Sequence, residues 1–432
     1  MMMHLSVYEL TLRPTGIFVG ERYFMCGIIG YSGNENAVPK LLYGLKALEY
    51  RGYDSAGIAV FEKDGITTVK AKGRIRNVEE KLEENYPSLS SFCGIGHTRW
   101  ATHGEPSDIN SHPHGTENLA LVHNGIIENY ISLKNFLTEQ GYIFVSQTDT
   151  EVAAKLIDYY YRASHDPLCA IRSALEKING SYAFGILFKD FPGKIYATRK
   201  DSPLIVALSD KGNYIASDIP AVLRHTNRYF QPEQGEIAVV SDKEATVYDL
   251  SGKPVEKTVK VADWDIDAAE KGGYEHFMIK EIHEEPSAVI KTIRPRVKDG
   301  LPELGLPALT DETLRSFERI HMVACGTAMH AGLIGKTAVE KLARIPVEVE
   351  IASEFRYKNP ILGKKDLVII ISQSGETADT LAALRLSKER GAYTLAIVNV
   401  AGSSIAREAD STLYTWAGPE IAVASTKAYT VQ

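Results

Sequence analysis

The chain has 432 residues, which is enough for two or three domains rather than one core. Hydrophobic residues make up 44% and charged residues 24%, as in ordinary globular proteins, and the net charge of −7 argues against a nucleic-acid-binding surface. No run of about 18 apolar residues predicts a membrane helix, and four cysteines without metal-ligand spacing predict reduced thiols, a cytoplasmic location and no metal site.

Residues 1–25 are unlike a signal peptide, because they lack a basic start, a long apolar centre and a small-residue cleavage site. They are upstream sequence, a removable propeptide or a retained tail. We favour the first interpretation, in which residues 1–25 are not part of the mature fold, because removal of Met25 as initiator would make Cys26 residue one. The free α-amine of Cys26, with a pKa of ~7.7–8.0, would then be available as a base for the thiol of the same residue. Taken alone, a cysteine among apolar residues is more often a small buried hydrophobe.

The first elements follow from hydrophobic spacing. Residues 27–31 predict a strand, and an amphipathic helix follows, with leucines at positions 41, 42, 45 and 48. A glycine-containing loop at 50–57 precedes strands over 57–62 and 67–72.

Residues 94–106 predict a loop that contacts a polar substrate. The spacing of His97 and His103 does not suit a zinc site. The guanidinium of Arg99 suits a two-pronged contact with a carboxylate, although a surface charge is the simpler interpretation of an arginine taken alone. For Trp100 taken alone, the simpler interpretation is a side chain packed in the core.

A buried strand over 119–123 leads to Asn124-Gly125, a dipeptide typical of turns, and then to a helix over 128–140. An asparagine amide beside a glycine N–H can also stabilise an oxyanion, so both interpretations stay open. Residues 146–151 resemble an N-cap before a helix that runs to residue 161, and Asp149 either caps that helix or holds a substrate ammonium.

Strands over 182–188, 194–198, 204–208 and 214–216 have short connections, which predicts an antiparallel α+β domain over 26–252. The polar segment 253–275 is the expected linker. A helix over 277–293 contains Pro286.

After residue 320, apolar runs at 320–324, 347–351, 367–371 and 394–398 alternate with helical segments, so 276–432 predicts a doubly wound parallel sheet. Two strand-to-helix loops, at 324–327 and 372–377, carry hydroxyls and backbone N–H groups suited to phosphate, or simply to helix capping. Residues 423–427 resemble a third ligand loop. Neither loop is a P-loop and no dinucleotide fingerprint occurs, so a compact sugar phosphate fits better than a nucleotide triphosphate or NAD, and no cofactor is expected.

Taken together, the motifs resemble the glutamine–fructose-6-phosphate aminotransferase (isomerising) family, from Cys26 to the last residue. The motifs that carry the resemblance are CGIIG at 26–30, YRGYDSAG at 50–57, HTRWATHG at 97–104, HNGIIEN at 123–129, ACGT at 324–327, IASEFRY at 351–357, SQSGETADT at 372–380 and VASTK at 423–427. Each motif is weak alone, but the set is specific.

The resemblance implies an N-terminal-nucleophile (Ntn) αββα glutaminase domain followed by a sugar isomerase (SIS) domain. Cys26 would attack the glutamine amide, with Asn124 and Gly125 as oxyanion hole. Arg99 would hold the glutamine carboxylate and Asp149 its amino group.

The resemblance also assigns the remaining site residues. Thr102 and His103 would line the glutamine pocket, and Trp100 resembles the gate of an internal ammonia channel. The sugar phosphate of fructose 6-phosphate would contact Thr327, Ser372, Gln373, Ser374, Thr377 and Ser425. The ammonia would aminate fructose 6-phosphate, and isomerisation would give glucosamine 6-phosphate.

The family continues into a second SIS lobe with a Schiff-base lysine and acid–base residues, and none of these has a position here. We therefore expect 276–432 to be a first SIS domain, incomplete at its C-terminus, and the chain to hydrolyse glutamine without making the amino sugar. A cytoplasmic homodimer through the SIS domains is expected, with no nucleic-acid or membrane partner. The alternatives are a glutaminase-only fragment, another glutamine amidotransferase with a different acceptor, and a non-catalytic sugar-phosphate sensor.

Overall fold

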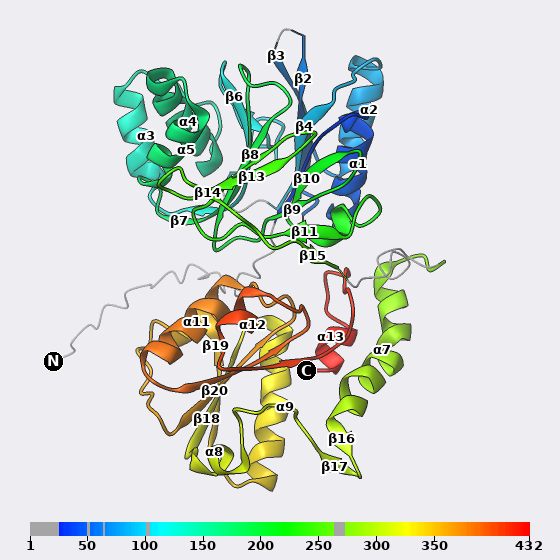
Figure 1. The fold of residues 1–432 in the computed structure, drawn as a ribbon, viewed down its shortest axis with the longest axis vertical. Helices are drawn as coiled ribbons and strands as arrows, with labels where there is room; N and C mark the ends of the chain where they lie inside the picture. The colour runs from blue at the N-terminus through cyan, green and yellow to red at the C-terminus, as the bar shows by residue number, and fades with distance from the viewer. Residues whose placement is uncertain (1–25, 50–51, 64, 101–103, 263–272) are drawn as a thin grey trace, which may run out of the picture.

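The computed structural model describes residues 26–49, 52–63, 65–100, 104–262 and 273–432. The expected extension over 1–25 and the predicted site residues Thr102 and His103 therefore lie outside the described residues. Two domains follow one another along the described chain (Figure 1). None of its helices is long and apolar enough to cross a membrane.

The first domain consists of two antiparallel sheets. Its strands are β1 Gly27–Gly33, β2 Ser55–Glu62, β3 Gly65–Lys72, β4 Cys93–Arg99, β5 His114–Gly115, β6 Leu119–Ile127, β7 Gly180–Phe188, β8 Ile195–Lys200, β9 Ile205–Ala207, β10 Gly212–Ala216, β11 Arg228–Phe230, β12 Ile237–Val240, β13 Ala245–Tyr248, β14 Pro254–Val255 and β15 Lys260–Val261. Eight strands form one sheet in the order β15-β11-β9-β10-β1-β4-β2-β3, and seven form the other in the order β14-β13-β12-β8-β7-β6-β5.

Helices cover the outer face of each sheet (Figure 1). They are α1 Ala37–Ala47, α2 Ile75–Asn85, α3 Tyr130–Glu139, α4 Asp149–Ser164 and α5 Pro167–Leu175, with a short 3-10 turn, η2 Ile219–Ala221. Leu41 and Leu45 of α1 are fully buried against the eight-stranded sheet, and α3 to α5 pack on the seven-stranded sheet. Ile28 and Val122 lie in a third apolar layer between the sheets. These layers confirm the predicted αββα architecture.

Two predicted local structures are wrong. The loop predicted at 94–106 begins later, because β4 continues through Arg99 in the ladder between β1 and β2. The turn predicted at Asn124-Gly125 is instead the middle of β6, which pairs with β7 along its whole length. Gly125 has φ +138°, and a Cβ there would stand 2.1 Å from the Ser181 carbonyl oxygen, so this strand position needs glycine.

The sheets extend into the range predicted as a linker. Strand β14 pairs with β13, and β15 pairs with β11. Residues Pro254–Val255 and Lys260–Val261 therefore belong to the sheets of the first domain.

The second domain contains a parallel sheet, as predicted. Its strand order is β19-β18-β20-β21-β22, and its edge strand β22 was not among the predicted strands. Its strands are β18 Arg319–Ala324, β19 Val347–Ile351, β20 Asp366–Ser372, β21 Tyr393–Val398 and β22 Ser411–Tyr414, and a separate ribbon is formed by β16 Val297–Lys298 and β17 Leu301–Pro302. Its helices are α7 Phe277–Ile293, η3 Arg294–Arg296, α8 Asp311–Ser316, α9 Gly326–Leu342, α10 Ala352–Phe355, α11 Ala378–Glu389, α12 Ser404–Glu408 and α13 Lys427–Thr430. Because β18 and β20 are parallel neighbours, their following loops lie at the same sheet edge, where open α/β sheets bind ligands.

Candidate active site

A pocket in the first domain brings together side chains from both sheets and from α4. Its lining consists of Cys26, Arg99, Trp100, His112, His123, Gly125, Thr148, Asp149 and Thr150. Five of the predicted site residues are therefore in one place. The cavity is small, about 20 Å³, which is roughly the space of one water. A larger ligand enters only if residues of the wall move apart.

Cys26 immediately precedes β1 at the wall of this pocket. Its Sγ accepts a hydrogen bond from the Trp100 backbone N–H at 3.2 Å and lies 3.5 Å from the Trp100 carbonyl oxygen. The Trp100 indole meets the Tyr53 ring edge-on, with centroids 5.1 Å apart. The Trp100 backbone therefore contacts the thiol of the predicted nucleophile.

The orientation of the Asn124 amide follows from its neighbour His97. The His97 Nε2 atom lies 2.9 Å from the His123 carbonyl oxygen, which only accepts, so Nε2 carries the hydrogen. The same nitrogen lies 3.0 Å from Asn124 Oδ1, which must also accept. The amide nitrogen therefore points the other way, where it donates to the Cys26 carbonyl at 2.6 Å and to Ser217 Oγ at 2.8 Å. An oxyanion can use an Asn124 N–H only by replacing one of these acceptors.

Buried histidines form a layer beneath this arrangement. The rings of His97 and His112 stack at 4.0 Å, and His114 meets His112 edge-on at 5.0 Å. Burial lowers the pKa of His97 and of His114 to about 3, and it lowers the pKa of His112 well below its usual range. The three rings are thus neutral near pH 7, and His97 acts as a hydrogen-bond donor rather than as a charge.

Arg99 is the cation of the pocket. It is only 3% exposed, and one guanidinium nitrogen donates to the Gly104 carbonyl at 3.0 Å. Burial lowers its pKa, whereas the nearby Cys26, Asp149 and Asp54 act in the opposite direction. An arginine remains charged at neutral pH in such surroundings, so the pocket presents a fixed positive charge to a ligand.

Asp149 is the anion of the pocket. It occupies the first turn of α4, where a carboxylate is stabilised by the helix dipole, and it is 5% exposed. Its Oδ2 accepts from the Ile127 N–H at 2.9 Å, while Thr148 caps the helix by accepting from the Glu151 N–H. Asp149 was predicted either to cap the helix or to hold a substrate ammonium. Its neighbour Thr148 is the capping residue, so the ammonium contact is the role left to Asp149.

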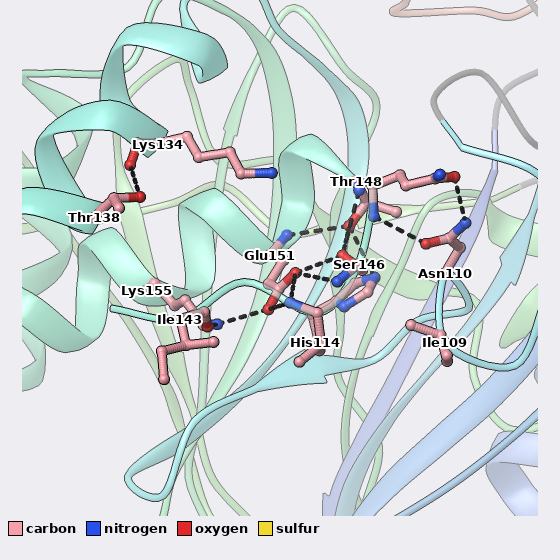
Figure 2. Close-up of polar contacts among 12 residues, drawn as sticks. Ile109, Asn110, His114, Lys134, Thr138, Ile143, Ser146, Thr148, Glu151 and Lys155 are labelled. Carbon is pink, nitrogen blue, oxygen red and sulfur yellow. Dashed lines mark hydrogen bonds and ion pairs between the residues drawn. The ribbon is translucent and has the colours of Figure 1, made fainter. Parts of the chain in front are cut away.

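A buried carboxylate fixes the loop that leads to Asp149 (Figure 2). Glu151 accepts from the Ser146 N–H and Oγ, both at 2.7 Å, and from the Val145 N–H at 3.0 Å. Lys155 pairs with it at 2.6 Å. Burial would raise the pKa of Glu151, but the lysine and these donors together lower it.

The predicted phosphate loop of the second domain has a defined shape. Ser372 Oγ accepts from the Gly375 N–H at 3.1 Å and lies 3.1 Å from Thr377 Oγ1. Gly375 has φ +66°, and a Cβ there would stand 2.0 Å from Ser403 Oγ, so a side chain does not fit. Gln373 and Ser374 are half-buried in the same loop. Their backbone and side chains are positioned at the start of α11, where an anion is favoured.

The other predicted phosphate contacts have different surroundings. Thr327 is exposed at the start of α9, on the same sheet edge as the phosphate loop, and Thr380 Oγ1 reaches the neighbouring Cys325 Sγ at 3.8 Å. Ser425 instead donates to Glu420 at 2.7 Å, in the segment before α13.

One group of side chains in the second domain has the composition of a metal site. Atoms of His321, Glu348 and Glu350 lie within 4.8 Å of one another on β18 and β19. Lys358 contacts both glutamates, so a lysine already offsets part of their negative charge.

Sequence reasoning missed several residues of the first site. It gave no role to His112 or His114, and it did not identify Ser217, which accepts from both Asn124 and the Ile28 N–H. Histidines next to an apolar, strand-forming segment were the available signal. The residues that these histidines contact come from distant parts of the sequence. The four cysteines form no disulfide.

Two family models match separate parts of the chain. The model described as "Glutamine amidotransferase domain" matches residues 97–224, and the model described as "SIS domain" matches residues 313–432. These ranges fall in the first and the second structural domain respectively.

Relatives match nearly the whole chain. The glutamine–fructose-6-phosphate aminotransferase (isomerising) of Clostridium tetani is 56% identical over 411 residues, which is 94% of this chain and 67% of that protein. The protein of the same name from Methanosarcina acetivorans is 49% identical over 421 residues, which is 94% of this chain and 68% of the relative. Among solved structures, the C-terminal domain of glucosamine-fructose-6-phosphate aminotransferase from Francisella tularensis is 46% identical, covers 38% of this chain and 45% of that one, and has a TM-score of 0.36.

Proposed function

The chain belongs to the glutamine–fructose-6-phosphate aminotransferase (isomerising) family, and on this premise we propose that it acts in the conversion of glutamine and fructose 6-phosphate to glutamate and glucosamine 6-phosphate. The first domain releases ammonia from glutamine. The second domain binds the sugar phosphate that receives it. The proposed division of the chain is 26–252 for the glutaminase domain, 253–275 for the connecting segment with its short sheet strands, and 276–432 for the SIS domain.

The observation that carries the proposal is the pairing of opposite charges around one thiol. A free α-amino acid has a carboxylate and an ammonium, and the pocket offers Arg99 to the first and Asp149 to the second. Cys26 lies in the same wall, where the side-chain amide of the bound amino acid can reach it. Thr102 and His103 are proposed to complete the pocket.

The glutaminase chemistry proceeds in two steps. The Cys26 sulfur bonds to the amide carbon, the carbon–nitrogen bond breaks, and ammonia leaves with the thiol proton. Water then hydrolyses the thioester to glutamate and restores the thiol. If residue 26 is the first residue of the mature protein, its own α-amine transfers the proton. Asn124 and Gly125 stabilise the oxyanion of both steps with N–H groups, and the oxyanion replaces one of the two present acceptors of the Asn124 amide, the Cys26 carbonyl or Ser217 Oγ.

The ammonia must reach the sugar without entering water, because ammonia is protonated there at neutral pH and is then no nucleophile. Trp100 is proposed to gate this passage, since its backbone contacts the Cys26 sulfur. The sugar phosphate is proposed to contact Thr327, Ser372, Gln373, Ser374, Thr377 and Ser425. The small pocket volume agrees with a gate that opens for glutamine.

We also propose that the chain works in the cytoplasm as a homodimer formed through its SIS domains. Exposed apolar side chains on α9, including Ile334 at 64% exposure, support an additional contact surface. Sedimentation of the purified chain tests the dimer, and a monomer at micromolar concentration contradicts it.

The function is tested by incubating the chain with glutamine and fructose 6-phosphate and measuring both products by mass spectrometry. We expect glutamate from the wild type and none above background from Cys26→Ala, while Cys169→Ala, at another half-buried cysteine, stays active. Glucosamine 6-phosphate in addition supports the full reaction. Glutamate that survives Cys26→Ala contradicts the nucleophile assignment.

Two other functions make different predictions in the same assay. A glutamine amidotransferase with another acceptor gives glutamate that does not respond to fructose 6-phosphate. A sugar-phosphate sensor gives no glutamate, although it binds the sugar. The presence of Cys26, Arg99 and Asp149 in one pocket favours the enzyme over both, because a sensor has no use for an amino-acid site beside a thiol.

A further inference from the structure

Two ion pairs connect the end of β8 with the phosphate loop region of the second domain. Arg199 Nη2 lies 4.0 Å from Glu376 Oε2, and Glu376 belongs to the loop 372–377. Two residues later, Asp201 Oδ1 lies 3.3 Å from Arg385 Nη1 on α11, the helix that this loop begins. The two pairs have opposite polarity, so they also fix the register of the contact.

Arg199 is unusual among these groups because it is fully inside the molecule. Its side chain is 1% exposed, and apart from the 2.7 Å hydrogen bond to the Ser202 carbonyl it faces the Glu376 carboxylate. A buried cation requires a partner of opposite charge. Glu376 in turn accepts from the Ser404 N–H at 2.8 Å, so one carboxylate joins the phosphate loop, the start of α12 and the first domain.

The seven-stranded sheet links these contacts to the candidate active site. In its register Asn124 lies opposite Ala183, and Ala183 lies opposite Arg199. Directly opposite residues in antiparallel strands direct their side chains to the same face. One row of the sheet therefore begins at the proposed oxyanion amide and ends at the buried arginine, a distance of about 10 Å across two strand spacings.

Asp201 contacts the same sheet next to this row. Gly125 lies opposite Tyr182, and Tyr182 forms an isolated parallel bridge with Asp201, outside the antiparallel ladder of β7 and β8. The residue that pairs with Arg385 is thus bridged to the strand position opposite Gly125.

A phosphate bound at the loop 372–377 would change the electrostatic field at Arg199. A phosphate dianion near the loop adds negative charge next to the Glu376 carboxylate, and like charges at such a distance repel. The buried guanidinium of Arg199 is the cation that pairs with this carboxylate across the two domains. A change in its position would act on the backbone of β8 and on the row that leads to Asn124.

We propose that the Arg199–Glu376 and Asp201–Arg385 ion pairs couple sugar-phosphate binding in the second domain to the oxyanion site at Asn124 and Gly125. The proposal rests on the proposed function and names the regulation of its glutaminase site. Arg199 and Asp201 act through other residues and contact no reacting atom. The experiment measures the coupling itself.

The measurement is the ratio of glutamate release with saturating fructose 6-phosphate to release without it, on the full chain. We expect Arg199→Met to lower this ratio by about 2- to 30-fold, the range in which residues along a coupling path act, while basal release and the KM for glutamine stay unchanged. Arg199→Lys keeps the charge and should retain most of the ratio. Arg76→Met, at an exposed pair with Glu80, is the matched control.

A second variant covers the case in which the buried substitution does not fold. Asp201 is 27% exposed at its side chain and has φ +60°, a conformation that asparagine tolerates, so Asp201→Asn should fold and lower the ratio. In the double variant Arg199→Met with Glu376→Gln, the ratio should fall no further than in Arg199→Met.

The outcomes separate this proposal from the proposed function. A wild-type ratio of one, or full stimulation in both Arg199→Met and Asp201→Asn, overturns the coupling but leaves the glutaminase in place. Absence of glutamate from the wild type overturns the proposed function itself. A lowered ratio in the interface variants with a normal ratio in Arg76→Met supports the coupling.

Discussion

At the scale of single residues, the Asn124 part of the candidate site depends on hydrogen-bond direction rather than on charge. The His97 ring is neutral because burial lowers its pKa to about 3, so it cannot serve as a cation near pH 7. Its one N–H is shared between the His123 carbonyl and Asn124 Oδ1. This single donor decides which end of the Asn124 amide faces Cys26.

Replacing His97 should therefore damage catalysis more than binding. We expect His97→Ala to lower the kcat of glutamate release by about 10²–10³-fold, as loss of an oxyanion donor does, with little change in the KM for glutamine. His97→Gln keeps an N–H donor near the same position and should recover much of the rate. His165→Asn, at an exposed histidine, is the control. Equal losses in His97→Ala and His97→Gln would show that the ring acts by packing instead.

At the scale of elements, the local pattern predicted the amphipathic helices and most strands well. The helix predicted over 277–293 agrees with α7 residue for residue, and the strand predicted over 347–351 agrees with β19. The pattern failed where distant pairing decides the conformation. Asn124-Gly125 favours a turn locally, but β7 supplies hydrogen bonds on one side of the whole segment and keeps it extended.

The residues of the candidate site also fall into those that local sequence predicts and those that it does not. Its charged and nucleophilic residues could be predicted, because their chemistry is visible in short motifs. Ser217 and Arg199 could not, since each matters only through partners far away in sequence. Nothing local distinguishes either from an ordinary polar residue at the end of a strand.

The start of α4 depends on one buried ion pair. We expect Glu151→Ala to lower the free energy of unfolding by about 3–5 kcal/mol, because it leaves Lys155 buried without its partner and removes an acceptor from Ser146 and Val145. The KM for glutamine should rise as the loop before Asp149 loosens. Urea unfolding and steady-state kinetics measure these effects.

A double variant separates the lost pair from the lost loop contacts. Glu151→Gln with Lys155→Met removes both charges and keeps an acceptor for the loop, so it should recover much of the stability. If Glu151→Ala unfolds at the wild-type urea concentration, the anchoring role is wrong.

At the scale of the whole molecule, two domains of different architecture place their polar sites differently. The first domain buries its pocket between sheets, above a layer of neutral histidines, whereas the second presents the loop 372–377, the proposed phosphate site, at a sheet edge. Burial of the histidines makes the first domain sensitive to acid. The second domain lacks such a layer among its described residues, where His321 faces two glutamates.

This difference predicts how stability depends on pH. In the unfolded chain a histidine binds a proton below about pH 6.5, but folded His97 and His114 do so only near pH 3. Their depressed pKa values therefore give stability that is complete above pH 6.5 and is lost as the pH falls toward 3. Each contributes a slope of at most about 1.4 kcal/mol per pH unit. Between about pH 6.5 and 5 carboxylates stay mostly ionised, so histidines dominate the slope there.

Hydrogen exchange of the β6 amides at about pH 7, 6 and 5, corrected for intrinsic exchange rates, measures this stability within the first domain. We expect protection of β6 to fall with pH in the wild type. His114→Gln removes one titrating ring while its amide can keep the hydrogen bond to Thr148, which lies 3.0 Å from His114 Nε2. Its slope should be smaller by about 1 kcal/mol per pH unit averaged over this range, because the histidine is only partly protonated in the unfolded chain near pH 7. A slope identical to that of the wild type would mean that His114 takes up its proton in the folded domain as readily as in the unfolded chain.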